Sequence, residues 1–123
     1  MLPAFDLGFN AVMVSNHGGR QLDRSPAPID VLESIVDAVG ADAEVILDGG
    51  VRRGTDILIA LALGAKAVGF ARPFLYGLAA AGEAGACRAM DILTNELRRD
   101  MVLLGTDCVS EINRSLVNRR QGH

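Results

Sequence analysis

The sequence predicts an α/β fold built on a parallel sheet, and three observations support this prediction. Short apolar runs at 11–14, 44–47 and 67–70 have the length and the aliphatic content of buried strands. Each run is followed by a loop rich in polar residues or glycine, and then by a segment with helical periodicity. Because crossovers between parallel strands are right-handed, we expect the three loops to converge at one edge of the sheet.

Composition limits the size of the protein and its classes of partner. The 123 residues suffice for one domain, and a chain that is 50% apolar but only 4% aromatic predicts an aliphatic core. The formal charge of -3 and the lack of a long basic run argue against a nucleic-acid partner. No run approaches the roughly 18 apolar residues of a membrane span, and the first residues lack the pattern of a signal peptide. We therefore expect a cytoplasmic protein without a membrane span.

The two cysteines predict neither a disulfide nor a metal site. Cys87 and Cys108 are 21 positions apart, with no CxxC motif and no second histidine nearby. This pattern favours two reduced thiols packed inside a cytosolic protein.

The first predicted helix follows a proline-containing turn and covers 28–39. Pro28 suits its first turn, Asp30 suits its positive N-terminal end, and Gly40 is a natural stop. Apolar residues at helical spacing define the face that we expect to pack on the sheet, namely Ile29, Leu32, Ile35, Val36 and Val39.

Three further helices complete the predicted pattern. One is capped by Gly54 or Thr55 and ends at Gly64, with an inward stripe formed by Ile57, Leu58, Leu61 and Ala62. A short helix is expected at 74–81. A long amphipathic helix follows at 83–104, and its apolar positions are Met90, Leu93, Leu97, Met101 and Leu104. A last short helix is expected at 110–116.

The loop after the first strand carries a candidate base beside a candidate anion-binding group. His17 is the only histidine away from the chain terminus, and Arg20 follows three positions later. The carboxyl ends of parallel strands are where α/β proteins place their chemistry. Imidazole can take a proton near neutral pH, and a guanidinium fork matches a carboxylate. His17 is therefore either a base beside an anion site or a hydrogen-bonded loop histidine.

The loop after the second strand, DGGVRRG at 48–54, is a candidate phosphate site. Gly49 and Gly50 would let a phosphate approach the backbone, and the first amides of the following helix are expected to be unpaired. Arg52 could bind the same phosphate, and Arg72 could reach it from the next loop. Two consecutive loops that hold a phosphate are expected after the seventh and eighth strands of a (β/α)8 barrel.

Two residues of this second loop keep alternative interpretations. Asp48 is either a ligand for a cofactor hydroxyl or a cap for the glycine turn. Arg53 is either a second arginine for the phosphate or a solvated charge.

Three motifs together identify a family. They are SNHGGRQLD, LDGGVRRGTDILIALALGA and ARPFLYGLAAAGEAG. The chain resembles the FMN-dependent α-hydroxy-acid dehydrogenase/oxidase family, which includes glycolate oxidase, lactate oxidase and mandelate dehydrogenase. The resemblance spans nearly the whole chain and implies the C-terminal part of a (β/α)8 TIM barrel. About three βα units would occupy 1–81, and closing helices would occupy 82–123.

The same resemblance assigns roles to individual residues. His17 would be the catalytic base and would contact the substrate, while Arg20 would bind the substrate carboxylate. The implied FMN-binding residues are Ser15 beside the flavin ring, Asp48, Gly49, Gly50, Val51 and Arg52 in a ribityl- and phosphate-binding loop, and Ala71 and Arg72 in a second phosphate arm. The family usually has glycine where this chain has Ala71. That alanine costs on the order of 1 kcal/mol if the backbone needs a positive φ there.

The implied activity is oxidation of an L-2-hydroxy acid to the 2-oxo acid with FMN as cofactor. The implied partners are a small 2-hydroxy acid and further copies of the full-length protein, in a homo-oligomer that we expect to be a tetramer. The proton could leave from the hydroxyl or from the α-carbon. A quinone acceptor would place the enzyme at the inner membrane as a peripheral protein.

A complete barrel typically needs about 250 residues, so we expect a truncated chain that is inactive alone. The family's lysine, tyrosines and aspartate near the flavin would come from other strands. Lys66 is expected at the opposite edge of the sheet, and Tyr76 in the following helix.

Two other functions are possible. One is a non-catalytic half-barrel that binds a phosphate or flavin and pairs with a complementary half. The other is a different phosphate-binding barrel enzyme, related to IMP dehydrogenase or to type 2 isopentenyl-diphosphate isomerase. The latter is disfavoured because neither cysteine is expected at the active edge and the His-x-x-Arg pair suits a carboxylate.

Overall fold

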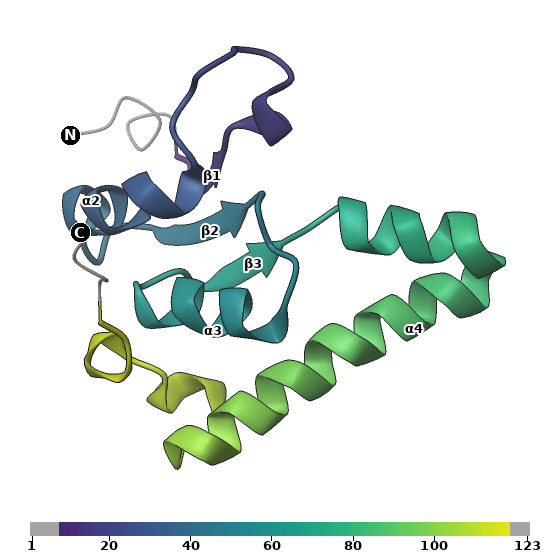
Figure 1. Ribbon diagram of the computed structural model, residues 1–123. Coiled ribbons are helices and arrows are strands. Elements are labelled where there is room, and N and C mark those ends of the chain that lie inside the picture. The colour runs from purple at the N-terminus through teal and green to yellow at the C-terminus, as the bar shows by residue number, and fades with distance from the viewer. Residues whose placement is uncertain (1–7, 119–123) are drawn as a thin grey trace, which may run out of the picture.

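The computed structural model describes residues 8–118 and is centred on a three-stranded parallel sheet (Figure 1). Its strands lie in the order β1 (Ala11–Ser15), β2 (Glu44–Asp48) and β3 (Ala67–Gly69). The register pairs Ser15 with Asp48 and Asp48 with Gly69. The three strands therefore end side by side at one edge, as expected for parallel strands joined by helices.

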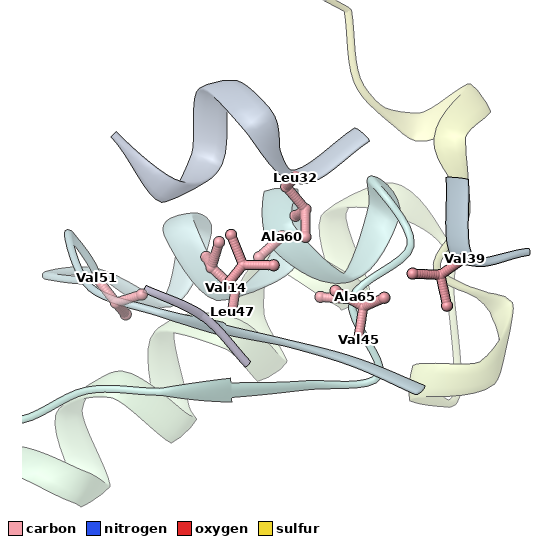
Figure 2. Packing of buried hydrophobic residues seen from close by; sticks show 8 residues of the cluster. All are labelled: Val14, Leu32, Val39, Val45, Leu47, Val51, Ala60 and Ala65. Atoms are coloured by element: carbon pink, nitrogen blue, oxygen red, sulfur yellow. The ribbon is translucent and has the colours of Figure 1, made fainter. Parts of the chain in front are cut away.

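Two helices connect the strands and cover one face of the sheet. They are α2 (Pro28–Val39) and α3 (Gly54–Ala62). Figure 2 shows the buried side chains of β1 and β2 directed toward Leu32 of α2 and Ala60 of α3. Both Leu32 and Ala60 have no exposed surface, and the predicted stripe of α2 packs on the sheet as expected. The predicted stripe of α3 is divided, because only Ile57 packs in this core and the other three residues, Leu58, Leu61 and Ala62, pack in a separate cluster. The core is aliphatic, as the composition predicts.

The other face of the sheet carries an uncovered apolar row. The strand register aligns Met13, Ile46 and Ala67, which alternate with the core residues along each strand. Met13 is 62% exposed. Because α2 and α3 both pack on the opposite face, no helix of residues 8–118 covers this row.

The next element, α4 (Arg72–Leu104), is two helices joined at a sharp break. Ala81 (φ -152°) and Gly82 (φ 60°) leave helical geometry, and Figure 1 shows the two arms folding back on each other. This agrees with the predicted helices at 74–81 and 83–104. The arms meet at Gly77 and Gly85, where a Cβ on either residue would lie within 3.0 Å of the other's backbone.

The second arm of α4 packs on α3 through a smaller cluster, formed by Leu58, Ala62, Met101 and Ile112. Leu93 is also buried. The two ends of the predicted stripe are less buried than its middle, since Met90 and Leu104 are 44% and 41% exposed. Only the middle of the stripe is therefore covered by the described chain.

Two predictions about the C-terminal region are wrong. The expected helix at 110–116 is two short 3-10 turns, η2 (Val109–Glu111) and η3 (Arg114–Leu116). The chain is extended at Asn113 between them, and the Asn113 side chain accepts a hydrogen bond from the Ser115 amide (3.1 Å), which starts a new turn. Cys87 and Cys108 are free, but both are exposed rather than packed.

Two structural findings concern a membrane span and a metal site. Within residues 8–118, no helix is long and apolar enough to cross a bilayer. The same residues contain no group of three metal-ligating side chains. The division of the chain at residue 82 stays a prediction.

Candidate functional site

A cleft of about 930 Å³ lies where the three strands end. The loops after β1, β2 and β3 all line it, which confirms that they converge. Every predicted site residue except Ser15 contributes to its walls, namely His17, Arg20, Asp48, Gly49, Gly50, Val51, Arg52, Ala71 and Arg72. The topology thus brings together residues that are up to 55 positions apart in the sequence.

The charge of the cleft is opposite to that of the chain. Three arginines, Arg20, Arg52 and Arg72, line it together with a single carboxylate, Asp48. The whole chain has a formal charge of -3. A concave cationic surface on an acidic protein concentrates anions, and guanidinium forks suit phosphate and carboxylate groups.

His17 stands on a left-handed turn, η1 (His17–Gly19). Its three residues have φ values of 55°, 67° and 74°. Such a backbone is easy for Gly18 and Gly19 but costs a non-glycine residue roughly 1–2 kcal/mol. Two side chains before the turn stabilise it: Ser15 Oγ accepts a hydrogen bond from the His17 amide, and Asn16 Oδ1 accepts one from the Gly18 amide, both at 3.0 Å.

Ser15 also connects the first loop to the second. Its hydroxyl donates a hydrogen bond to Asp48 Oδ2 at 2.7 Å. Asp48 faces the cleft and is held by this hydroxyl rather than by the amides of the glycine turn. This contact argues against the cap alternative for Asp48. Ser15 itself does not line the cleft but orients Asp48, which does.

The prediction that the first amides of the second helix are unpaired is wrong. Asp56 Oδ2 accepts hydrogen bonds from the amides of Arg52 and Arg53, both at 2.9 Å. Glu96 Oε2 of α4 accepts one from the Gly54 amide at 2.8 Å. Carboxylates of the protein itself therefore occupy the N-terminus of α3.

The remaining groups of this loop still fit a phosphate. Gly49 and Gly50 have φ values of 107° and 81°, and a Cβ on Gly50 would meet no atom within 4 Å. Among residues 8–118, no acceptor bonds the amides of Gly50 and Val51. These amides and the Arg52 and Arg72 guanidinium groups form an open cradle for an anion at the cleft.

Arg53 is absent from the cleft lining and its side chain is 67% exposed, which supports the solvated-charge interpretation over a phosphate ligand. Its guanidinium pairs with Glu96 of α4, with Nη2–Oε1 at 2.9 Å and Nε–Oε2 at 3.1 Å. The predicted cap at Thr55 is also absent, because its hydroxyl donates to Asp100. The Gly54 amide and then the Arg53 guanidinium hold the pKa of the Glu96 carboxyl below its usual value. These contacts fix the phosphate loop to α4.

Glu96 and Tyr76 are relevant residues that sequence reasoning missed. Tyr76 lines the cleft, although it was predicted only as a helical residue. A signal existed for it, because Tyr76 lies four positions after Arg72 and so one helical turn along the same face. No local signal pointed to Glu96, which is 42 positions from the amide it binds. Lys66 precedes β3 and is absent from the cleft lining, as expected.

A second cavity of about 560 Å³ lies between α2, α3 and the end of α4. Most of its walls are aliphatic. Two of the three carboxylates in its lining are already engaged, because Glu33 pairs with Arg114 and Asp100 accepts from Thr55. We therefore place the candidate site in the arginine-lined cleft.

Comparisons with known proteins give a consistent result. The family model described as FMN-dependent dehydrogenase matches residues 1–119. The chain is 53% identical to a peroxisomal (S)-2-hydroxyacid oxidase of Arabidopsis thaliana, 54% to human 2-hydroxyacid oxidase 1 and 50% to an L-lactate oxidase of a Nostoc strain. These matches cover 91–94% of this chain but only 30–32% of the relatives. The chain thus spans about a third of the length of the curated relatives it matches.

Solved structures agree with these relatives. A flavocytochrome b2 variant superposes with a TM-score of 0.87 at 47% identity, covering 94% of this chain and 31% of that one. A mandelate oxidase variant superposes with a TM-score of 0.86 at 46% identity, covering 91% and 36% respectively. Such neighbours are TIM-barrel enzymes, so the predicted fold, part of a (β/α)8 barrel, is confirmed.

Proposed function

The chain belongs to the FMN-dependent dehydrogenase family, and from this we propose that it supplies one part of an active site that oxidises an L-2-hydroxy acid to the 2-oxo acid. Similar proteins named as 2-hydroxyacid, lactate and mandelate oxidases support the reaction class. The observation that carries the proposal is the convergence of His17, Arg20 and the arginine-lined phosphate cradle on one cleft.

The cradle fits the phosphate end of FMN. Gly50 leaves open space, its amide and that of Val51 point to no acceptor among residues 8–118, and Arg52 and Arg72 add two positive charges. Asp48, oriented by Ser15, is placed to accept a hydrogen bond from a ribityl hydroxyl. Ala71 lines the second arm of the cradle. When bound, FMN would accept the two electrons of the reaction.

His17 and Arg20 are proposed to act on the substrate. Arg20 would bind the carboxylate of the hydroxy acid through a charge-assisted bond. Its position three residues after His17 would then hold the hydroxyl-bearing carbon near the imidazole, which would take the proton. Both side chains line the same cleft as the phosphate cradle.

The test combines turnover with a variant that keeps the shape of the base. The 123-residue chain is mixed with the missing two-thirds of a curated 2-hydroxyacid oxidase and FMN, and oxidation of glycolate, lactate and mandelate is measured. We expect turnover from the mixture, at least 100-fold less from the His17→Gln mixture, and none from the chain alone. Equal turnover with His17→Gln would reject the proposed base, and efficient turnover by the chain alone would reject the claim that it is catalytically incomplete.

A second candidate is a non-catalytic half-barrel that binds flavin and pairs with a complementary half. The uncovered row of Met13, Ile46 and Ala67 favours such pairing, because the interior of a barrel is normally filled by side chains from all its strands. Both functions predict a complex in sedimentation of the mixture, so turnover distinguishes them. A complex that binds FMN but turns over no hydroxy acid supports the half-barrel alone.

The setting of the full-length protein is also a proposal. We propose a homo-oligomer, a tetramer, in the cytoplasm, with no nucleic-acid partner. The net charge of -3 supports the absence of a nucleic-acid partner, and the two free cysteines support the cytoplasm. Two relatives are named as peroxisomal, so cell fractionation is the deciding measurement.

A further inference from the structure

Asn16 lies at the junction of the two loops that form the candidate site. Its Oδ1 accepts a hydrogen bond from the Gly18 amide at 3.0 Å, within the left-handed turn of His17. Its Nδ2 donates to the carbonyl of Pro26 at 3.3 Å, near the end of the same loop. A Cβ on Gly49, in the phosphate loop, would lie 3.6 Å from Asn16 Oδ1. One half-buried side chain thus bonds two backbone positions of its own loop and lies beside the phosphate loop.

The contacts of Asn16 require an amide in one orientation. The Gly18 N–H can only donate and the Pro26 carbonyl can only accept, so a flipped amide would lose both bonds. Aspartate could still accept from Gly18, but it would place an oxygen against the Pro26 carbonyl. Alanine could make neither bond.

The bond to Gly18 is important because the His17 backbone is strained. With a φ of 55°, His17 occupies a conformation that non-glycine residues adopt only when their surroundings impose it. The Ser15 hydroxyl and the Asn16 amide impose it from consecutive positions. Only the Asn16 amide also ties the turn to the far side of the loop.

We propose that Asn16 is a positioning residue, whose side-chain amide fixes the turn that directs the His17 imidazole into the cleft. This inference rests on the proposed role of His17, but it concerns where the ring points rather than what the ring does. Without the amide, the turn would relax toward ordinary backbone angles and the imidazole would leave the cleft.

The experiment uses nuclear magnetic resonance on the 123-residue chain. The imidazole resonances of His17 are followed while oxalate, a dicarboxylate probe, is added, and His123 serves as an internal reference. The variants are Asn16→Ala, Asn16→Asp and Ser25→Ala. Ser25 is the matched control because its hydroxyl bonds the Leu22 carbonyl in the same loop without contacting the turn.

We expect Asn16→Ala to keep the dispersed amide spectrum of the folded chain while losing the oxalate-induced shift of His17. Water exchange at the Gly18 amide should become about fivefold to tenfold faster, as for a lost helix-cap bond. Asn16→Asp should keep slow exchange at Gly18 but show a reduced oxalate response, and Ser25→Ala should match the parent chain.

The proposal is overturned if His17 responds to oxalate equally in the parent chain and in Asn16→Ala. It is also overturned if both Asn16 variants unfold, because the amide would then support the whole chain rather than the turn. A parent chain in which oxalate moves no His17 resonance overturns it too. A reaction that failed in the turnover test while these shifts behaved as expected would reject the proposed function and leave Asn16 in its role.

Discussion

Replacing Gly54 with alanine tests how the phosphate loop is fixed to the rest of the protein. Gly54 opens α3 directly after the loop, and α3 crosses α4 at this residue. A Cβ here would lie 2.6 Å from the carbonyl carbon of Glu96, against main-chain atoms that cannot rotate away. The two helices would have to separate by roughly 1 Å to restore ordinary contact.

The cost follows from two contributions. Overpacking of this kind typically costs about 1–3 kcal/mol. Separation would also break the bond from the Gly54 amide to Glu96 Oε2, which adds to this cost. We therefore expect Gly54→Ala to lower the free energy of unfolding by about 3 kcal/mol or more, at or above the upper end of the range for overpacking alone.

Urea unfolding of the chain, followed by far-ultraviolet circular dichroism, measures this loss. Gly105→Ala is the matched control, because Gly105 ends α4 with a φ of 71° and a Cβ there would meet no atom within 4 Å. In this control, the positive φ alone should lower the free energy of unfolding by about 1–2 kcal/mol. If Gly54→Ala loses no more stability than Gly105→Ala, the close crossing of α3 and α4 is refuted.

Two further predictions concern α4. Glu96→Gln should be clearly less stable than the parent chain near neutral pH. Because the pKa of Glu96 is lowered in the folded protein, its contribution is complete above the usual value of 4.5 and is lost as the pH falls through the lowered value. Urea unfolding of both chains between pH 7 and 3 should therefore show a shrinking difference, whereas a constant difference would contradict this role. Gly85→Ala should force apart the two arms of α4, where a Cβ would approach the Gly77 backbone within 3.0 Å. We expect this variant to lower the free energy of unfolding by about 1–3 kcal/mol, measured by thermal unfolding, and an unchanged midpoint would contradict the contact.

The sequence predicts the fold well because its local signals agree with one another. The apolar runs, the helical stripes of α2 and α3 and the stop at Gly40 each indicate the element that forms. The prediction of one helix at 110–116 fails for a local reason. The Asn113 side chain caps a new turn, so the helix is interrupted there.

The sequence predicts which residues line the site but not which hydrogen bonds they make. Parallel topology alone places His17, Asp48 and Arg72 in one cleft. The bond to Asp56 has a local signal, because an acidic residue three positions after the capping residue is typical of a helix start. No sequence spacing could reveal the bond to Glu96, which lies 42 positions from the Gly54 amide. Long-range contacts of this kind decide which amides remain for a ligand.

The most direct test of the phosphate cradle compares FMN with riboflavin, which has the same ring and ribityl chain but no phosphate. Binding of each to the 123-residue chain is measured by the change in flavin fluorescence, with Arg72→Ala and Arg53→Ala as paired variants. We expect FMN to bind at least tenfold more tightly than riboflavin, since charge-assisted bonds to a phosphate should contribute more than about 1.4 kcal/mol. Arg72→Ala should abolish most of this preference, and Arg53→Ala, whose guanidinium pairs with Glu96, should retain it. Equal affinities for FMN and riboflavin in the parent chain would contradict the phosphate cradle.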